Sequence, residues 1–467
     1  MTQNEGRTLL LKAHEFADLA HAGQHRKSGE DFINHCIRIK NLLEDVGIKD
    51  PITLSAALLH AVVSHGTATQ EEVEKEFGEE IAYLVEILTD IARNPIPLEN
   101  ENKRVENLHK LFIQLSKDIR VLIIRLADRV DNIQTCDSLK LESRKWISQK
   151  ALTIYSPIAK AVGIYMYNRL LMDECLRITN PDRYKKIFRY RKIEFQNVEK
   201  QLEKVKYDIS RYLSEKNIKH EISYRKKGIY STHEKAINKA KKGDIRNAND
   251  FAGLHDMIGL RVIVEDIPDC YIVLAYLQEN FPTINEEFDD YIRKPKGNGY
   301  RSLQIPVKIN NKHICEVQIR TFEMHDLNEY GAASHFVYKY GELNSEKSIG
   351  WIKELIEMKD QINESLAKTP AIKIFEDTIF VFTPKESLIT LPKGSTPVDF
   401  AYAIHTDLGK TCCGAKINGK LVKLDAELKS GQTIEIMTDR NHRPSPHWLE
   451  FAKSKCARDE ITKSIRL

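Results

Sequence analysis

Apolar residues recur at helical spacing through the first third of the chain. One such set returns to the same side of a helix every three or four positions: Leu9, Leu10, Ala13, Phe16, Ala17 and Ala20. The run Leu54–Val63 is almost entirely apolar, which predicts a buried helix, and Val121–Val130 predicts a second one. Residues 7 to about 180 are therefore expected to be helical. Their prolines are expected at the edges of elements, namely Pro51, Pro95, Pro97 and Pro157.

The pattern changes after this helical part. Residues 186–217 are highly charged and predict a helical connector, and residues 218–340 mix strand and helix signals. A β-branched strand is expected at Leu260–Val264 and a second strand at Cys315–Ile319. The second strand alternates strictly, so Glu316, Gln318 and Arg320 should share one polar face, opposite Cys315, Val317 and Ile319.

The last quarter of the chain is rich in strand and turn signals. Residues 346–370 predict a polar amphipathic helix, and Thr378–Thr383 predicts a strand. The turn at Leu391–Pro397 should lead into a helix at Val398–His405. The patterns together predict these successive segments: 1–180, a connector at 181–217, 218–342, a linker helix at 343–371, 372–438, and a helical region at 439–467.

Composition narrows the class of protein. A length of 467 residues suggests about three domains, and 42% hydrophobic residues suffice for ordinary globular cores. The formal net charge of +4 gives no global polyanion signal, so any phosphate contact must be local. No apolar run approaches the length of a membrane span, and the N-terminus lacks a signal-peptide pattern. Eight scattered cysteines without metal spacing indicate reduced thiols and a cytoplasmic protein.

Residues 287–320 concentrate the candidate chemistry. Gly297 and Gly299 would let the backbone approach a ligand closely, and Tyr300 offers an aromatic face for a base. Glu316 then follows on the polar face of its strand, where a carboxylate suits metal binding or base catalysis. Three cations beside the glycines are candidates to hold phosphates: Lys294, Lys296 and Arg301. This combination predicts nucleotide chemistry.

The same stretch resembles the synthetase domain of the RelA/SpoT homologue family, the long alarmone synthetases. The family's Asn-Gly-Tyr-x-Ser-Leu loop is matched at 298–303 and its Glu-Val-Gln-Ile-Arg-Thr strand at 316–321. The match continues through Met324, His325, Glu329, Gly331 and His335. The resemblance implies a multidomain chain with an all-α HD-type domain, then an α+β nucleotidyltransferase-like synthetase domain with a mixed sheet, then a small β-grasp TGS domain.

The resemblance also implies a reaction and a site. The family transfers pyrophosphate from ATP to the 3′-hydroxyl of GTP or GDP, giving pppGpp or ppGpp and AMP in the stringent response. Asp256 and Glu316 would bind Mg²⁺, and Glu316 would act as metal ligand, as the base for the hydroxyl proton, or as both. Arg261 would pack on adenine and Tyr300 on guanine. The remaining residues implied to contact the nucleotides are Arg225, Lys227, Ser231, Lys235, Lys296, Asn298 and Gln304.

The N-terminal helical segment resembles the family's HD hydrolase domain, but its metal site is degenerate. Active members bind their metal through a His, an adjacent His-Asp pair and a distant Asp, which correspond here to His35, His60-Ala61 and Asp128. Their acidic Glu-Asp pair is replaced by Ser64 and His65. Hydrolase activity and Mn²⁺ binding are therefore not expected. The family's nucleotide-contacting positions are retained at Arg26, Lys27 and Asn132.

Two further departures bear on activity. Gln304 stands where a His is common, and Glu287-Phe288-Asp289-Asp290 matches the acidic motif of synthesis-only members, which should raise dependence on Mg²⁺. The expected function is thus a synthesis-only GTP diphosphokinase. Two alternatives remain: a bifunctional synthetase and hydrolase, or a non-catalytic regulator that binds alarmone or tRNA.

Residues 372–438 resemble a TGS domain through matching residues within 391–405, which implies contact with uncharged tRNA and the ribosome. Lys410 stands where the family commonly has a His, so a phosphate contact replaces recognition by an imidazole. Long family members continue beyond the position of Leu467. The sequence is compatible with a naturally short protein or with a fragment, and it leaves the oligomeric state open.

Overall fold

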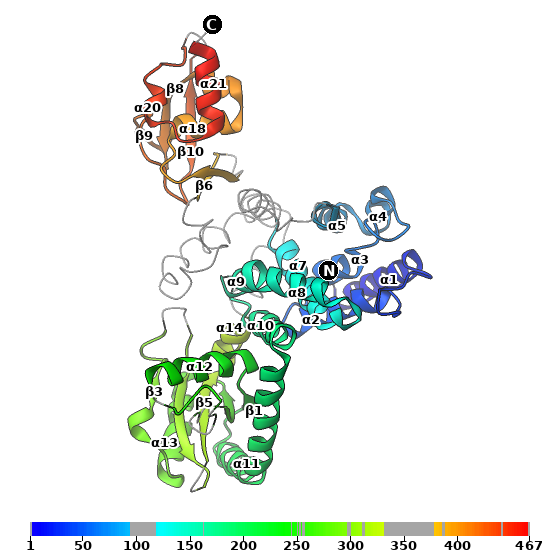
Figure 1. Cartoon of the computed structure of the whole chain (residues 1–467), viewed down its shortest axis with the longest axis vertical. Helices are drawn as coiled ribbons and strands as arrows, with labels where there is room; N and C mark the ends of the chain where they lie inside the picture. Colours follow the sequence, from blue (N-terminus) through cyan, green and yellow to red (C-terminus); the bar gives the residue numbers. More distant parts are fainter. Residues whose placement is uncertain are drawn as a thin grey trace. The chain divides into compact units, whose positions relative to one another are not determined.

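A computed structural model of the chain describes residues 2–93, 118–161, 163–243, 245–249, 251, 254, 257–296, 300–310, 313–330, 378–384, 388–439 and 442–465 (Figure 1). Its contacts divide the chain into two units. One unit contains Met1–His21, Asp50–Ile124 and Phe336–Leu467, and the other contains Ala22–Lys49 and Arg125–His335. No helix in the described part of the chain is long and apolar enough to cross a membrane.

Several helices form the N-terminal part of the chain. They are α1 (Gln3–Ala20), α3 (Pro51–Leu59), α4 (Gln70–Phe77) and α5 (Glu79–Arg93), and α7 (Ile119–Gln134) passes from the first unit into the second. Thr2 and Thr69 each form a capping box, with Glu5 and Glu72, and Asp50 caps α3 ahead of Pro51. The predicted helix Val121–Val130 lies within α7 and is confirmed. Pro95 and Pro97 lie outside the described residues.

The helix predicted at Leu54–Val63 is wrong in its extent. Although the whole run except Val63 is buried, α3 ends at Leu59, and His60 is its C-cap. The backbone tightens there, because Val62 N donates to Leu59 O and both His65 N and Gly66 N donate to Ala61 O. Residues 60–65 therefore form consecutive turns, which apolar content alone did not distinguish from a helix.

The second unit begins with the helices α2 (Ile33–Asp45), α8 (Leu141–Lys150), α9 (Ser156–Ala161), α10 (Tyr165–Thr179) and α11 (Pro181–Glu215), and a short 3₁₀ turn η1 (Cys136–Ser138) precedes α8. A π-helical turn, η2 (Ala151–Tyr155), joins α8 to α9. Pro157 lies in the first turn of α9, at an element edge as predicted, because the π turn separates the two α-helices.

A five-stranded mixed sheet forms the centre of the second unit. Its order is β1 (His220–Lys226), β2 (Ile258–Val264), β5 (Ile314–Thr321), β4 (Leu303–Lys308) and β3 (Asp289–Asp290). The β2–β5 pair is parallel and the other pairs are antiparallel. The helices α11 and α13 (Ile267–Asn280) pack on the face that carries Leu260, Val262, Val317 and Ile319 (Figure 1). The predicted mixed sheet and both predicted strands are confirmed.

The helix predicted as a connector belongs to this core. The helix α11 begins at Pro181 and packs on β1, β2 and α13. Apolar residues along its length join the core of the sheet: Ile187, Val198, Leu202, Val205, Ile209 and Leu213. The predicted helix is thus confirmed, and its packing ties it to the sheet.

The C-terminal module has a β-grasp arrangement. Its strands are β6 (Thr378–Phe382), β7 (Leu388–Pro392), β8 (Cys412–Ile417), β9 (Lys420–Val422) and β10 (Ile434–Thr438). A parallel bridge between Phe382 and Thr433 connects the β6–β7 hairpin to the start of β10. The strands β10, β8 and β9 form an antiparallel sheet in that order. The predicted strand and helix are found as β6 and α18 (Pro397–Ile404), and α19 (Thr406–Lys410) follows.

The last described residues pack on this module. The helices α20 (Trp448–Phe451) and α21 (Lys455–Ile465) place Trp448, Ala457 and Ile461 in one core with Val398 and Tyr402 of α18. Asp399 is fully buried and accepts hydrogen bonds from the backbone of Lys453 and Ser454. The predicted helical region at 439–467 therefore shares its core with the module, whereas the predicted linker helix at 343–371 lies outside the described residues.

Candidate functional site

One face of the central sheet carries a continuous row of polar side chains. The strand register aligns Arg261 on β2 with Gln318 on β5, then with Gln304 on β4 and Asp289 on β3. A second row joins Arg225 on β1 to Gly259 on β2 and to Glu316 on β5. The predicted alternation of β5 is confirmed, but its polar face is not exposed, because Gln318 and Arg320 are buried.

Glu316 is held as a hydrogen-bond acceptor at the edge of this face. Its Oε1 lies 2.9 Å from Nη1 of Arg225 and accepts a 2.8 Å hydrogen bond from Nε2 of Gln318. The side chains of Arg225 and Glu316 are 19% and 18% exposed, so a ligand could reach both. Gly259 lies between them, and a Cβ there would meet the Glu316 carbonyl oxygen at 1.9 Å. The strand spacing at the candidate base therefore requires a glycine.

A second cluster links the sheet to α14 (Phe322–Tyr330). One oxygen of Glu329 lies 2.6 Å from Arg261 Nη2 and 2.9 Å from Arg320 Nη2. Burial lowers the pKa of Arg261 to about 10, and the neighbouring Arg320 adds to the effect. Burial alone would raise the pKa of Glu329, but the two arginines outweigh it and leave that pKa lowered. The arginines are therefore held by one shared, ionised carboxylate.

His325 belongs to the same positive environment. Burial and the nearby Arg320 and Arg261 lower its pKa to about 4, so the imidazole is neutral at physiological pH. The sequence matched His325 and Glu329 to the family without giving either a role. The contact between α14 and the sheet shows that Glu329 holds the two arginines in place. The spacing of these residues along the chain gave no sign of this contact.

Tyr300 is fixed by a small polar network. Its hydroxyl accepts hydrogen bonds from Ser302 Oγ at 3.0 Å and from Gln304 Nε2 at 2.8 Å. The ammonium of Lys296 lies 5.3 Å from the centre of the Tyr300 ring and 4.1 Å from that of Tyr291. The structure thus brings Lys296, Tyr300 and Gln304 together. Asp256 and Asn298 lie outside the described residues.

Three of the residues that the resemblance implies as nucleotide contacts lie around the start of α12 (Ile229–Lys242). Lys227 follows β1, and Ser231 and Lys235 lie four residues apart on the helix, which places them on one face. The start of the helix is held from α10, since Asp173 Oδ1 accepts a 2.8 Å hydrogen bond from Tyr230 N. Arg191 of α11 donates to the Lys227 carbonyl at 2.7 Å. The first amides of the helix thus donate to the Asp173 carboxylate, and the groups near this helix N-terminus that could hold a phosphate are the cations Lys227 and Lys235.

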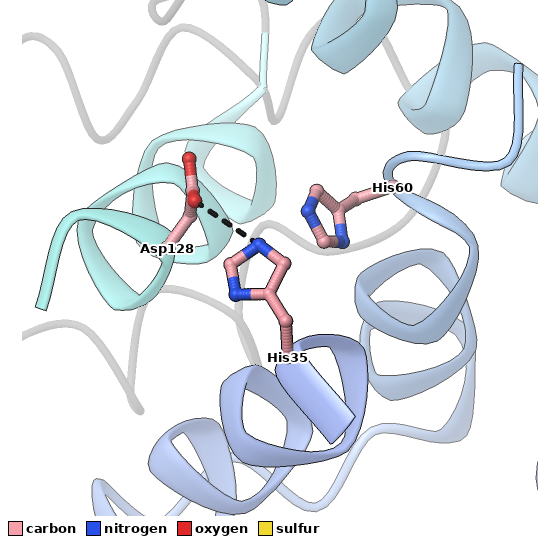
Figure 2. Close-up of side chains that lie close together, drawn as sticks. All are labelled: His35, His60 and Asp128. Atoms are coloured by element: carbon pink, nitrogen blue, oxygen red, sulfur yellow. Dashed lines mark ion pairs between the residues drawn. The ribbon is translucent and has the colours of Figure 1, made fainter. Parts of the chain in front are cut away.

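Three residues of the predicted degenerate metal site lie together. One ligand atom from each of His35, His60 and Asp128 lies within 4.8 Å of the others, and all three side chains are buried (Figure 2). Nδ1 of His35 lies 2.6 Å from Asp131 Oδ2, and Nδ1 of His60 lies 2.8 Å from Ala57 O. Since those oxygens only accept, Nδ1 carries the proton in both rings and Nε2 is left as the ligand atom.

Asp128 is nevertheless engaged by cations. Its Oδ2 lies 2.6 Å from Arg125 Nη1 and 2.9 Å from Arg129 Nη2, and its Oδ1 accepts from Asn132. Ala61 supplies no ligand, and the Ser64 hydroxyl lies 2.8 Å from His65 Nδ1. His65 lies within the turns that follow α3.

The sequence did not identify Asp131, although it lies three residues after Asp128 on α7. It is 1% exposed and contacts His35, Arg38 and Arg26. Arg26 also donates to Asn132 at 2.7 Å, so these two nucleotide-contacting positions are together, whereas Lys27 is exposed. A carboxylate one helical turn from a candidate ligand is the signal that would have identified it.

Comparison with known proteins finds three family models in order along the chain. They are the HD domain at residues 13–165, a region found in RelA / SpoT proteins at 224–343, and the TGS domain at 379–438. Guanosine-3′,5′-bis(diphosphate) 3′-pyrophosphohydrolase of Aquifex aeolicus is 38% identical over 98% of this chain and 64% of its own length. GTP pyrophosphokinase of Myxococcus xanthus is 34% identical over 98% of this chain and 60% of its own length.

The chain thus spans about three-fifths of the length of these curated relatives. One relative is named a pyrophosphohydrolase and the other a pyrophosphokinase, and the three domains occur in the predicted order. A solved structure, the small alarmone synthetase 1 from Bacillus subtilis bound to its product pppGpp, covers 39% of this chain and 96% of its own at 22% identity. Its TM-score is 0.26, which is too low to carry an argument.

Proposed function

Because the chain belongs to the RelA/SpoT family, we propose that it is a GTP diphosphokinase, which transfers pyrophosphate from ATP to the 3′-hydroxyl of GTP or GDP and releases AMP. The observation that supports this most is the polar face of the central sheet. It gathers a partly exposed carboxylate, Glu316, with the cations Arg225 and Arg261 and, through Gln304, the ring of Tyr300. A carboxylate, cations and an aromatic ring are the groups that this transfer requires.

Each residue has a proposed role that follows from its position. Arg225, Lys227 and Lys235 neutralise phosphate oxygens at the start of α12. Glu329 holds the edge of the Arg261 guanidinium at 2.6 Å, which leaves a flat face of the guanidinium for adenine. Tyr300, fixed through its hydroxyl, presents its ring to guanine.

The chemical step is an in-line transfer. Glu316 accepts the proton of the 3′-hydroxyl as Arg225 turns from it toward the phosphates. The 3′-oxygen bonds to the β-phosphorus of ATP, the bond from that phosphorus to the α–β bridging oxygen breaks, and AMP leaves with that oxygen.

Mg²⁺ fits the donor set at this site. The oxygen of Glu316 is partly exposed, and Mg²⁺ is commonly held by one or two carboxylates together with substrate phosphates. Glu316 and Asp256 are the residues that would hold it, and when bound it neutralises charge on the phosphates. Asp289 lies opposite Gln304 on the polar face, so its carboxylate should strengthen the dependence of synthesis on Mg²⁺, whereas Asp290 faces the other way and accepts from Tyr271.

The decisive test uses two incubations of the whole chain. One contains ATP, GTP and Mg²⁺, and the other contains ppGpp and Mn²⁺, with products separated by chromatography. AMP and pppGpp in the first incubation support the proposal. Their absence, with alarmone or tRNA binding retained, supports a non-catalytic regulator instead.

Tyr300→Ala is expected to weaken GTP binding selectively. Stacking on an aromatic ring contributes about 1–3 kcal/mol per base, so the KM for GTP should rise roughly fivefold to a hundredfold while that for ATP changes little. Separate titrations of the two nucleotides measure this. In Tyr300→Phe the ring remains, but Ser302 and Gln304 lose their acceptor, so GTP binding should hold while the melting temperature falls. Equal weakening of ATP and GTP in Tyr300→Ala would remove this residue from the guanine site.

We also propose that this chain only synthesises. The support is the composition of the degenerate metal site. Ala61 replaces a ligand there, and Asp128 already forms ion pairs with Arg125 and Arg129. The second candidate is a bifunctional enzyme, and the convergence of His35, His60 and Asp128 favours it (Figure 2). A metal held there would have two imidazoles and one carboxylate, without acidic groups to activate its water.

No appreciable release of pyrophosphate from ppGpp is expected with Mn²⁺. The combined change Ala61→Asp, Ser64→Glu and His65→Asp is the minimum expected to restore it, because it returns the missing ligand and both acidic groups. Pyrophosphate release is measured for both proteins beside synthesis. Hydrolysis by the unmodified chain at a rate comparable to synthesis would show that the enzyme is bifunctional.

For the C-terminal module we propose contact with the acceptor end of uncharged tRNA on the ribosome. The support is the match to the TGS family and the basic residue Lys410 at the end of α19.

A further inference from the structure

Three cationic side chains converge between α7 and the end of α8. Arg125 and Arg129 lie one turn apart on α7, and Lys150 is the last residue of α8. Lys150 is 7% exposed, and the side chains of Arg125 and Arg129 are 12% and 26% exposed. Burial lowers the pKa of Lys150 to about 8, with Arg129 and then Arg125 adding to the effect. The three charges are therefore close enough to repel one another.

A single carboxylate faces these charges within the described part of the chain. Asp128 Oδ2 lies 2.6 Å from Arg125 and 2.9 Å from Arg129, and no described carboxylate lies within ion-pair distance of Lys150. Aromatic rings lie beside Lys150 and Arg129 instead. The Lys150 ammonium lies 3.6 Å from the centre of the Trp146 ring, and the Arg129 guanidinium lies 5.5 Å from that of Tyr155. The positive charge is thus only partly balanced.

Hydrogen-bond donors are also left over. Nε of Arg125 and Nε of Arg129 are buried, and neither has a partner among the residues that the structure describes. Buried donors nearly always have a partner in native proteins. The π turn η2 begins directly after Lys150 and ends at Tyr155, and such turns occur frequently at functional sites. The excess positive charge, the two Nε donors without a described partner and the π turn therefore lie in the same part of the structure.

We propose that Arg125, Arg129 and Lys150 bind a phosphate group, carried by inorganic pyrophosphate or by a phosphorylated nucleotide. Phosphate oxygens match the forked donors of arginine, and a doubly charged group balances the excess that Asp128 leaves. The partial exposure of Arg129 gives the ligand access. The site needs no metal, and it is independent of the proposed synthesis because its residues lie within the segment matched by the HD domain.

The test measures pyrophosphate binding to the whole chain in the absence of divalent metal, by calorimetry and by melting temperature. Lys150→Met should raise the dissociation constant about tenfold or more, since a hydrogen bond to a charged group is lost. The same change should raise the melting temperature of the ligand-free protein, because a buried and repelled charge is removed. Lys145→Met, on the exposed side of the same helix, should change neither quantity.

Opposite results overturn the proposal. A lower melting temperature with an unchanged dissociation constant would make Lys150 a structural residue. Pyrophosphate binding that is lost in Arg225→Gln and retained in Lys150→Met would place the anion at the sheet. Where Lys150→Met does weaken binding, equal affinities for pyrophosphate and ppGpp identify a free oxyanion as the ligand. Tighter binding of ppGpp that is lost in Lys150→Met identifies a phosphorylated nucleotide.

Discussion

Glu316→Gln should reduce AMP formation from ATP and GTP at least a hundredfold while the chain stays folded. Loss of a positioned general base typically lowers a rate by about a hundredfold to ten-thousandfold, and loss of a metal ligand acts in the same direction. Glutamine keeps the volume and can still accept from Gln318, so the strand is preserved. The ion pair with Arg225 is lost, and because both side chains are less than a fifth exposed, we expect a lower melting temperature in a chain that stays folded.

The matched control is Glu323→Gln, an exposed carboxylate on α14 only seven positions further along. It should leave synthesis unchanged. Circular dichroism and the melting temperature report folding in both variants. If Glu316→Gln kept more than about a tenth of the turnover, Glu316 would be neither the base nor an essential metal ligand.

Gly259→Ala is expected to disrupt the centre of the sheet and with it synthesis. The new Cβ would lie 1.9 Å from the backbone oxygen of Glu316, and a backbone atom paired in the parallel β2–β5 ladder has little room to move. Overpacking of this kind costs about 1–3 kcal/mol and sometimes more, and we expect the upper end of that range. Hydrogen exchange of the β2 and β5 amides should accelerate, and AMP formation should fall in parallel.

Gly414→Ala in β8 provides the comparison. A Cβ there would make an ordinary 3.5 Å contact with the Met437 sulfur, and the residue does not have a positive φ. Stability should change by no more than about 0.5 kcal/mol. If Gly259→Ala showed exchange and activity like those of Gly414→Ala, the strands would not be as closely constrained as the structure indicates.

The alternation in β5 was enough to predict which side chains share a face with Glu316. Cys315, Val317 and Ile319 do lie in the core. Alternation could not predict that the polar face is covered as well, because Glu329 reaches Arg261 and Arg320 from a helix that follows β5. The alternation of side chains and their composition predict a strand and its two faces. A salt bridge between two elements depends on how those elements pack, which the alternation does not contain.

The helix α11 shows a different limit. Val198, Leu202, Val205 and Ile209 recur every three or four positions, so its buried stripe was present in the sequence. The surrounding charges favoured interpretation as a solvated connector. At the end of α3, apolar residues continue past the point where the backbone turns, so hydrophobicity predicted burial there and not helix length.

The packing of α11 also determines where this chain can be divided for study. A recombinant fragment that starts at the first strand, at His220, would lose the helix that supplies Val198, Leu202 and Ile209 to the sheet core. A start at Pro181 would keep that helix but lose Asp173, which holds the beginning of α12. A fragment intended to report nucleotide affinity should therefore begin ahead of α10, near Ile164, so that the sheet, its covering helix and the anchored end of α12 are expressed together.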